Sequence, residues 1–396
     1  MFEPDFLNQN HNCQPLFISQ VGAAEGFFGG QAAAALARGI PIQWCFCTPY
    51  LLMWTLNAPA ITNFRVSMDF YYGRSWDIGV TSLLVMALGK APSKDTLWTT
   101  DNGAQATTRG GCDKTGCPPD HSTPAAELHT ALALLSTGPV GFSDAPNETD
   151  ASLIRRTCDS AGNLLQPSRP ITAVDSTFSA AGAPAGGYVL ATHTAIGGGS
   201  ALPPALHIVV AHQLTADYAL LLRDLWPAPG AGSGVWLSTA ASVHALRGCA
   251  GGASAAACGV ARVAVPAGAP PTLPLGLTLP APPRGADAFA PVLALSARTC
   301  APAPPSAAAL ALFGEVEKLA PVSVQRFLAL ACGVSSGGGG DATLALTLAG
   351  QAGEAVALTW VAWAGEAGTV HTGSHTFEAA GQVDCAIEGA ALTCSA

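Results

Sequence analysis

Four aspartates follow short apolar segments of the kind that form buried strands. Asp5, Asp69, Asp101 and Asp144 each lie at or just after the end of such a segment. In parallel sheets whose strands are joined by helices, the residues that carry out chemistry lie at the carboxyl ends of the strands. Carboxylates gathered there can act as a nucleophile and as a general acid or base. The alternative is that each aspartate only caps the helix that follows it.

The apolar segments alternate with helix-like segments over roughly the first 165 residues. Five units of strand followed by helix predict an α/β region with parallel strands. Parallel strands are covered by helices on their faces, which explains why these segments are continuously apolar. We expect strands over 2–7, 40–46, 61–66, 96–100 and 139–142, and helices over 22–38, 49–56, 76–88, 124–135 and 148–158.

After about residue 165 the pattern changes to strands with no helices between them. The change predicts an all-β domain, and a sandwich is the architecture that we favour. The part from 227 to 306 is rich in Ala, Gly and Pro, which indicates an insert or long loops. The expected domains are therefore 1–165, which is α/β, and 166–396, which is a C-terminal β-sandwich. We expect strands at 188–194, 206–210, 217–222, 235–237, 343–348 and 355–360.

Composition excludes two classes of partner. The chain has 396 residues, 49% of them apolar and only 11% charged, with a formal net charge of −9. An acidic chain without a Lys/Arg cluster lacks the charge that holds nucleic acid or an anionic membrane surface. The uncharged stretch from Arg38 to Arg65 is long enough to span a bilayer. Prolines divide it into pieces of strand length, so we expect no membrane span.

The cysteines favour disulfides over a metal site. There are twelve, and they lack the close Cys/His spacing of zinc ligands. We predict bridges between Cys112 and Cys117, across a tight loop, and between Cys385 and Cys394, on the last two strand-like segments. Cys249 and Cys258 flank a Gly/Ala-rich loop, where a bridge is also in keeping with the pattern. The close pair Cys45-Phe-Cys47 has the wrong spacing for zinc.

Disulfides indicate an oxidising compartment, and the glycosylation sequon Asn147-Glu-Thr149 points the same way. An extracellular or secretory location is therefore expected, although the first residues do not form a signal peptide. We expect no metal and no cofactor. The histidines His193, His207 and His212 fit packing or surface positions of the β domain, and the Gly-rich segments do not open a helix after a strand.

Several stretches resemble the motifs of a known enzyme clan. Arg65-Val-Ser-Met-Asp69-Phe-Tyr is similar to Arg-x-Ser-Asp-Asp-Phe-Tyr, and Gly138-Pro-Val-Gly-Phe-Ser-Asp144 is similar to Gly-Pro-Val-Gly-Val-Ser-Asp. Leu164-Leu-Gln-Pro-Ser-Arg-Pro170 resembles the entry into a C-terminal β domain. The clan is that of the retaining glycosidases, which includes the α-galactosidases and the plant raffinose synthase and seed-imbibition proteins.

The segments Glu3-Pro-Asp5-Phe-Leu and Ala91–Thr100 resemble uncharacterised animal and algal members of the clan. The likeness covers residues 1–170 well and 310–396 faintly. It implies a (β/α)₈ barrel, of which this chain supplies five units that match strands 4 to 8. Cys45 and Thr48 would lie in strand 5. Strands 1 to 3 have no counterpart here, so we interpret the chain as a fragment or a truncated gene model with a partial barrel.

The resemblance also assigns roles. Retaining glycosidases place two carboxyl groups about 5–5.5 Å apart, one as nucleophile and one as acid/base. Asp5 matches the nucleophile after strand 4. After strand 6 the expected Asp-Asp pair is Met68-Asp69. If the first member is the acid, the site lacks it, because a thioether donates no proton; if the second member serves, Asp69 keeps the role.

Four further residues are candidate sugar contacts. The resemblance implies that Arg65 lies near the sugar hydroxyls, and an ion pair with Asp69 or Asp77 is the alternative. Trp44, Trp98 and Asp144 lie at strand ends. An aromatic ring suits the apolar face of a hexose, while a tryptophan in the core is the alternative.

Three functions remain open from the sequence. The first is an enzyme that hydrolyses or transfers an α-linked hexose of the galactoside type, with a carbohydrate substrate as its partner. The second is an inactive relative that binds a glycan. The third is a secreted interaction module carried by the β-sandwich. Met68 favours the second function, whereas Asp5 and Arg65 favour the first.

Overall fold

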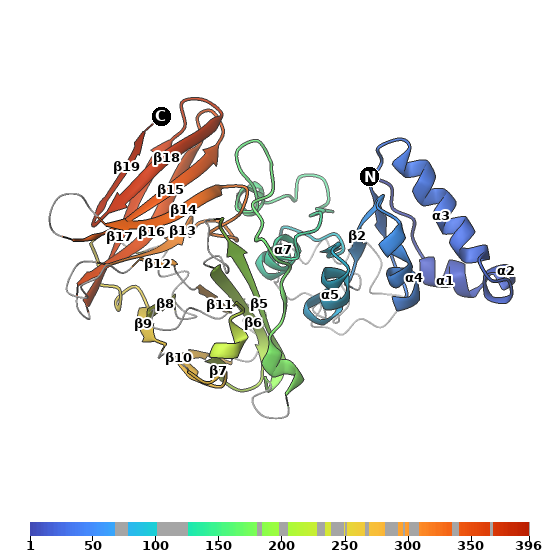
Figure 1. The fold of residues 1–396 in the computed structure, drawn as a ribbon, viewed down its shortest axis with the longest axis horizontal. Helices are drawn as coiled ribbons and strands as arrows, with labels where there is room; N and C mark the ends of the chain where they lie inside the picture. The colour runs from blue at the N-terminus through green and yellow to red at the C-terminus, as the bar shows by residue number, and fades with distance from the viewer. Residues whose placement is uncertain are drawn as a thin grey trace.

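The structure is a computed structural model that is strand-rich, with helices mainly in the N-terminal third and several antiparallel sheets in the rest (Figure 1). Met68, Asp69, Asp77, Asp101 and the predicted Cys112–Cys117 bridge lie outside the described residues. The described part contains no closed barrel. The structure describes residues 1–67, 78–100, 126–179, 184–197, 205–227, 234–238, 249, 252–265, 269–281, 292–295, 298–300, 309–334, 340–364 and 367–395.

Parallel strands form the centre of the N-terminal region. Strands β1 (Ile42–Trp44), β2 (Ile61–Arg65) and β3 (Ala91–Ser93) lie side by side in that order, all parallel. A parallel bridge joins Phe2 to Ile42, and another joins Leu97 to Phe142. Each of the five predicted strand regions thus contains at least one residue in parallel pairing, although β2 pairs with β3 and not with the predicted region 96–100.

Helices follow the strands as the pattern predicts. They are α1 (Leu7–Asn12), α2 (Pro15–Ser19), α3 (Ala23–Leu36), α4 (Pro49–Trp54), α5 (Ile78–Ala87), α7 (Ala126–Leu135) and α8 (Ala151–Arg155), with a 3-10 turn η1 (Thr55–Asn57) after α4. Helix α4 begins where the sequence predicts, because Pro49 suits the first turn and the Thr48 hydroxyl accepts a hydrogen bond from the Leu51 N–H at 3.4 Å.

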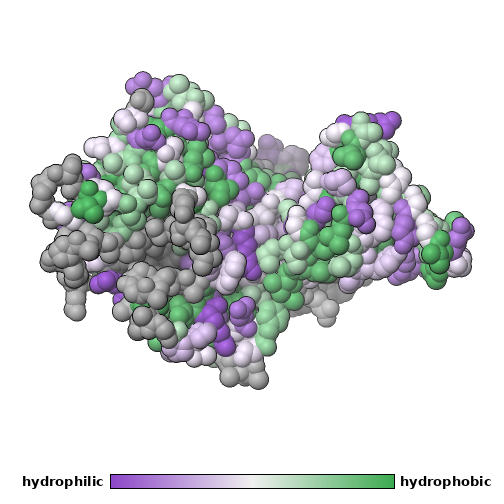
Figure 2. Space-filling model, in the orientation of Figure 1, coloured by the Kyte–Doolittle hydropathy of each residue, from purple (hydrophilic) through white to green (hydrophobic). Residues whose placement is uncertain are grey.

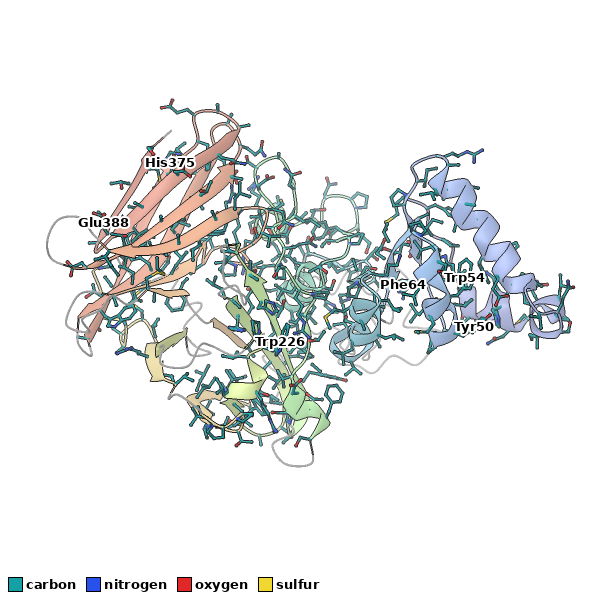
Figure 3. All side chains as sticks on the ribbon, viewed as in Figure 1. Tyr50, Trp54, Phe64, Trp226, His375 and Glu388 are labelled. Carbon is teal, nitrogen blue, oxygen red and sulfur yellow. A yellow bond between two sulfur atoms is a disulfide. The ribbon has the colours of Figure 1, made fainter. Side chains whose placement is uncertain are left out.

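Aromatic packing holds these helices on one face of the sheet. Trp44 is only 1% exposed, stacks on Trp54 of α4 and meets Phe28 of α3 and Phe64 of β2 edge-on. Figure 3 labels Trp54 and Phe64 in this layer. Full burial of each such side chain contributes about 1.5–3 kcal/mol to the free energy of folding, relative to leaving it exposed. The odd-numbered residues Gln43 and Asn63 point to the opposite face, because side chains alternate along a strand.

The C-terminal part contains two antiparallel four-stranded sheets that pack on a shared core, and this pair of sheets is called the sandwich below. Sheet β12-β13-β16-β17 faces sheet β14-β15-β18-β19, and their shared core contains Leu312, Leu346 and Trp360. Strand β15 alternates buried and more exposed positions, as a strand with one face on a core requires. The bounds are β12 (Arg298–Cys300), β13 (Ala309–Gly314), β14 (Phe327–Val334), β15 (Ala342–Gly350), β16 (Ala355–Ala364), β17 (Ala367–Thr376), β18 (Gly381–Glu388) and β19 (Ala391–Ser395).

Between the sandwich and the α/β region lies a further sheet, β11-β6-β5-β4. The buried helix α7 packs with this sheet and with the outer face of β13, so that Leu132, Leu190 and Phe313 share one core. The remaining strands form two small pairs, β8-β9 and β10-β7. The bounds are β4 (Thr172–Ala173), β5 (Gly186–Ala195), β6 (Ala205–Leu214), β7 (Tyr218–Leu221), β8 (Gly234–Ser238), β9 (Val260–Ala264), β10 (Pro274–Leu279) and β11 (Val292–Leu295), with 3-10 turns η2 (Asp175–Phe178) and η3 (Leu222–Asp224).

Some expectations about element positions are wrong. The strand expected over 96–100 is β3 at 91–93, and only Leu97 of the expected segment makes a bridge. Pro92 takes part in β3, where it pairs with Phe64, because the carbonyl of a proline can still accept a hydrogen bond in a short strand. The segment 2–7 pairs only at Phe2, because α1 already begins at Leu7. The helix expected over 148–158 is shortened to α8, which Asp150 caps.

Three disulfides tie the β-rich part together. The Cys385–Cys394 bridge is confirmed, with the two Cα atoms 4.0 Å apart on paired strands β18 and β19. Cys249–Cys258 closes the loop that the two residues flank. Cys300–Cys332, which joins the two sheets of the sandwich, was not predicted, since 32 residues separate its cysteines. The thiols of Cys13, Cys45, Cys47 and Cys158 are free.

Apolar side chains also occur on the surface. Leu16, Ile18, Val21 and Phe27 of the N-terminal helical part are at least half exposed, and green areas cover this part in Figure 2. They contribute to the mean hydropathy of +0.35. Among the described residues no helix has the length and apolar character needed to cross a membrane.

A buried ion network joins the sandwich to the segment after α8. The Arg326 guanidinium, 1% exposed, donates to Glu315 at 2.9 Å and to both oxygens of Glu354. Glu354 also accepts from the backbone N–H of Ser160, at 3.2 Å. The guanidinium holds the pKa of Glu354 below its ordinary value despite burial, whereas burial raises the pKa of Glu315.

We expect Arg326→Ala to lower the free energy of unfolding by about 3–5 kcal/mol, because it leaves two buried carboxylates without their cation. The matched control is Arg156→Ala, which breaks the more exposed pair with Glu127 (2.6 Å) and should cost about 0–1 kcal/mol. Urea unfolding followed by circular dichroism measures both. Equal losses for the two variants would contradict the structural role of the Arg326 network.

Buried histidines on β5 and β6 make stability depend on pH. Burial lowers the pKa of His193 to about 4 and the pKa values of His207 and His212 to about 3. The ordinary value in an unfolded chain is about 6.5. Between these values the unfolded chain binds protons that the folded chain does not, so the free energy of unfolding decreases as the pH falls from 6.5 towards 4.

We expect His193→Gln to reduce the dependence of the unfolding free energy on pH. The slope should fall by up to about 1.4 kcal/mol per pH unit, which is the value for one proton. Unfolding free energies of both proteins at several pH values between 7 and 4.5 measure it. The same slope in the variant would show that His193 is not buried in its neutral form.

Candidate active site

One face of the parallel sheet carries a buried row of polar side chains. The Gln43 amide donates to a Glu3 carboxylate oxygen at 2.6 Å, and the Asn63 amide donates to the Gln43 carbonyl oxygen. The Ser93 hydroxyl lies 3.2 Å from the same oxygen and donates to the Phe64 backbone carbonyl at 3.0 Å. Gln43, Asn63 and Ser93 are 8%, 2% and 1% exposed. Their hydrogen bonds offset the free-energy cost of burying polar groups.

A second polar row lies two residues further along each strand, on the same face. It comprises Asp5, Cys45, Arg65 and Asp95, at the carboxyl ends of four neighbouring strand segments. The Arg65 guanidinium donates to the Cys45 sulfur at 3.4 Å and pairs with the Asp95 carboxylate at 3.4 Å. The Asp5 carboxylate lies near enough to the Cys45 thiol to help raise its pKa. Direct contacts therefore join Cys45, Arg65 and Asp95, and Asp5 lies beside Cys45.

Backbone contacts fix the arginine. Its Nε donates to the Ser67 carbonyl at 3.2 Å, and the Ser67 hydroxyl accepts from the Asp95 N–H at 2.9 Å. The guanidinium carbon also lies 4.8 Å from the centre of the Phe46 ring, a cation–π contact. The side chain of Arg65 is 9% exposed and that of Asp95 is 20% exposed, so water screens this pair only in part.

The thiol at the centre of the row is a hydrogen-bond donor. Burial and the neighbouring Asp5 raise the pKa of Cys45 to about 12, and burial raises the pKa of Cys47 as well. Cys45 is therefore protonated at neutral pH, and a protonated thiol is neither a nucleophile nor a metal ligand. The exposed carboxylate of the row is that of Asp5, which leaves a carboxylate as the nucleophile available here.

Two aromatic residues with left-handed backbone end the strands beside this row. Phe6 has φ 54° and Phe46 has φ 48°, and their rings stack with centroids 5.6 Å apart. Bulky residues rarely adopt such angles, and they concentrate where a site holds the backbone in place. The Asp5 carboxylate accepts the Phe6 N–H at 2.6 Å and makes no capping bond to α1. The alternative of a simple helix cap therefore does not describe Asp5.

Asp5 and Arg65 both lie in the second polar row, whereas Trp44 and Asp144 lie outside it. Trp44 lies in the aromatic layer on the opposite face, outside the site. Asp144 accepts from the Thr99 N–H at 2.7 Å and from its hydroxyl at 2.9 Å, and so joins two neighbouring strand segments. Trp98, next to Thr99, is half-buried. The proposed acid Asp69 belongs to the part that the structure leaves undescribed.

Sequence reasoning missed two of the four residues of the second row and all of the first row. Asp95 was not singled out, and Cys45 was noted only as part of a strand and of a cysteine pair with the wrong spacing for zinc. A signal was present, because Gln43 and Asn63 interrupt apolar strands and a polar or thiol residue follows each two positions later. That period of two marks one face of a strand.

The groups of the row that a ligand can reach are the exposed Asp5 carboxylate and the partly accessible Arg65–Asp95 pair, which can form hydrogen bonds with hydroxyl groups. The Cys45 thiol is buried beneath them. Among the described residues no cluster of His, Cys, Asp or Glu could hold a metal ion. No protein-family model matches the chain, and no curated protein matches it either.

Thiol labelling tests the state of Cys45. At pH 7.5 we expect iodoacetamide to modify the exposed Cys13 quickly, and Cys45 only after denaturation, because burial keeps Cys45 protonated and covered. Mass spectrometry of peptides from the native and the urea-treated chain gives the extents. Comparable labelling of the two residues in the native chain would contradict the described environment of Cys45.

Proposed function

We propose that this protein is a glycosidase-like enzyme that hydrolyses or transfers an α-linked hexose of the galactoside type. The supporting observation is that Asp5 and Arg65, which match the clan's motifs, both lie at the carboxyl edge of parallel strands on either side of Cys45, which Arg65 contacts at 3.4 Å. In this proposal the parallel strand segments are strands 4 to 8 of a partial (β/α)₈ barrel. The C-terminal sandwich accompanies it, and the partner is a carbohydrate.

In the proposed reaction the Asp5 carboxylate attacks the anomeric carbon and the glycosidic C–O bond breaks. The product is a glycosyl ester that water then hydrolyses, with net retention of configuration. The protonated Cys45 thiol lies beside Asp5 and, by donating to it, would hold its carboxylate in one orientation. Arg65 and Asp95 are placed to bond sugar hydroxyls, because both remain partly accessible. Asp69 is the proposed acid that protonates the leaving oxygen.

The second candidate function is glycan binding without turnover, and Met68 is the observation that favours it. A thioether stands where the clan's pattern has the first of two carboxyl groups. General acid catalysis is worth roughly 10²–10⁴ in rate, so its loss would leave a binding site with little activity. The second row would still offer its hydroxyl-binding groups to a sugar.

The proposed location is extracellular or within the secretory pathway. Its support is the set of three disulfides, which form and persist in oxidising compartments.

We expect the chain to release nitrophenol slowly or not at all from a nitrophenyl α-galactoside. Asp5→Asn should abolish what activity there is, because it removes the nucleophile. Met68→Asp should raise cleavage of a natural α-galactoside, whose leaving group needs protonation, by roughly 10²–10⁴ if the first position is the acid. Initial rates with both substrates give these ratios.

Asp384→Asn, on β18 of the sandwich, is the matched control and should leave the rates unchanged. Galactoside binding measured by calorimetry separates the two candidate functions. Binding without turnover in the native chain and in Met68→Asp favours the glycan-binding relative. Turnover that persists in Asp5→Asn would exclude Asp5 as the nucleophile.

A further inference from the structure

The chain contains a single Asn-x-Ser/Thr sequon, Asn147-Glu148-Thr149. A sequon is used only where its asparagine reaches the surface in a compartment that carries out N-glycosylation. The structure supplies evidence on the exposure of Asn147 and on the compartment. This evidence is independent of the proposed glycosidase reaction.

Asn147 lies at the tip of a turn between the bridge at Phe142 and helix α8. Asn147 and Thr149 are both exposed, and no hydrogen bond engages the Asn147 side chain among the described residues. Its φ is 69°, a left-handed conformation that asparagine tolerates better than most residues. The side-chain amide is therefore available without any change to the fold.

Both ends of the turn are fixed to Thr99. Asp144 accepts from the Thr99 N–H at 2.7 Å and from its hydroxyl at 2.9 Å, and the Asp150 N–H donates to that hydroxyl at 2.7 Å. Within the turn the Glu148 N–H donates to the Ala145 carbonyl at 3.0 Å. A substituent on Asn147 would extend from a defined loop that packs against the preceding strand segment.

The disulfides bear on the compartment independently of the sequon. All three lie in the β-rich part, and the Cys300–Cys332 bridge joins strands from two different sheets. Their formation requires an oxidising environment, and in eukaryotic cells that environment is the one in which asparagines are glycosylated.

We propose that Asn147 is an N-glycosylation site. The donor is an oligosaccharide linked through its first N-acetylglucosamine to a lipid pyrophosphate. The Asn147 amide nitrogen forms a bond to the anomeric carbon of that sugar, while the bond from the anomeric carbon to the pyrophosphate oxygen breaks. The lipid pyrophosphate leaves with the electron pair, and the amide nitrogen loses one proton to the transferase.

The test is expression of the full chain behind a cleavable secretory leader in cultured eukaryotic cells, with intact-mass analysis of cellular and secreted protein before and after peptide N-glycosidase. We expect one N-glycan, removed by the enzyme with conversion of Asn147 to Asp. Asn147→Gln and Thr149→Ala should lack it, and Thr149→Ser should keep it.

Non-reducing peptide mapping of the glycosylated protein should find the three disulfides, and its unfolding midpoint should match that of Asn147→Gln. A chain that forms the disulfides without a glycan would overturn the proposal. So would a glycosylated chain that fails to form them while Asn147→Gln forms them, because the glycan would then be incompatible with the fold. Galactoside cleavage plays no part in either outcome, so the proposal stands or fails separately from the proposed function.

Discussion

The guanidinium of Arg65 is the group on which the polar edge of the sheet depends. It contacts Cys45 on one side and Asp95 on the other, and its Nε is held by the Ser67 carbonyl. Three neighbouring strand ends are therefore joined through one cation. A charge with so little exposure is stable only when it is paired and hydrogen-bonded, so the strand ends must keep this spacing. Asp5 lies beside the Cys45 thiol that this cation contacts.

The two faces of the parallel sheet differ in character, one apolar and one polar, because side chains alternate between the faces along each strand. Trp44 and Phe64, on even-numbered positions, enter the aromatic layer beneath α3 and α4. Gln43 and Asn63, on odd-numbered positions, form the buried polar row on the other face. A shift of one residue in strand register would place amides among aromatic rings and tryptophan among polar groups. The register is thus specified twice, by apolar packing and by hydrogen bonding.

The sequence predicts the elements well and the site only in part. Strands such as β5, β6, β15 and β16 come from clear apolar patterns, and the Cys385–Cys394 bridge follows from two adjacent strands. Bridges across the sandwich, such as Cys300–Cys332, depend on sheet pairing that no local pattern contains. Asp95 was missed because the preceding strand is only three residues long and contains Pro92. Trp44 shows a second limit of prediction from sequence. A tryptophan at a strand end fits a sugar site and a core equally well until it is known which face of the sheet carries its side chain.

The β-rich part is joined to the α/β region by more than a linker. Helix α7 shares one core with β5, β6 and β13. At the end of α8, the Lys318 ammonium donates to the carbonyls of Arg155 and Cys158 at 2.8 and 2.7 Å. A cation suits the carboxyl end of a helix, where carbonyls lack partners. Ser160, just beyond, bonds Glu354 of the Arg326 network. Because apolar burial, a helix end and a buried ion network all cross this boundary, the sandwich and α7 must keep one relative position. Helix α7 leads along the chain into the strand segment that ends at Asp144, and the hydrogen bonds of Asp144 to Thr99 hold that end in place.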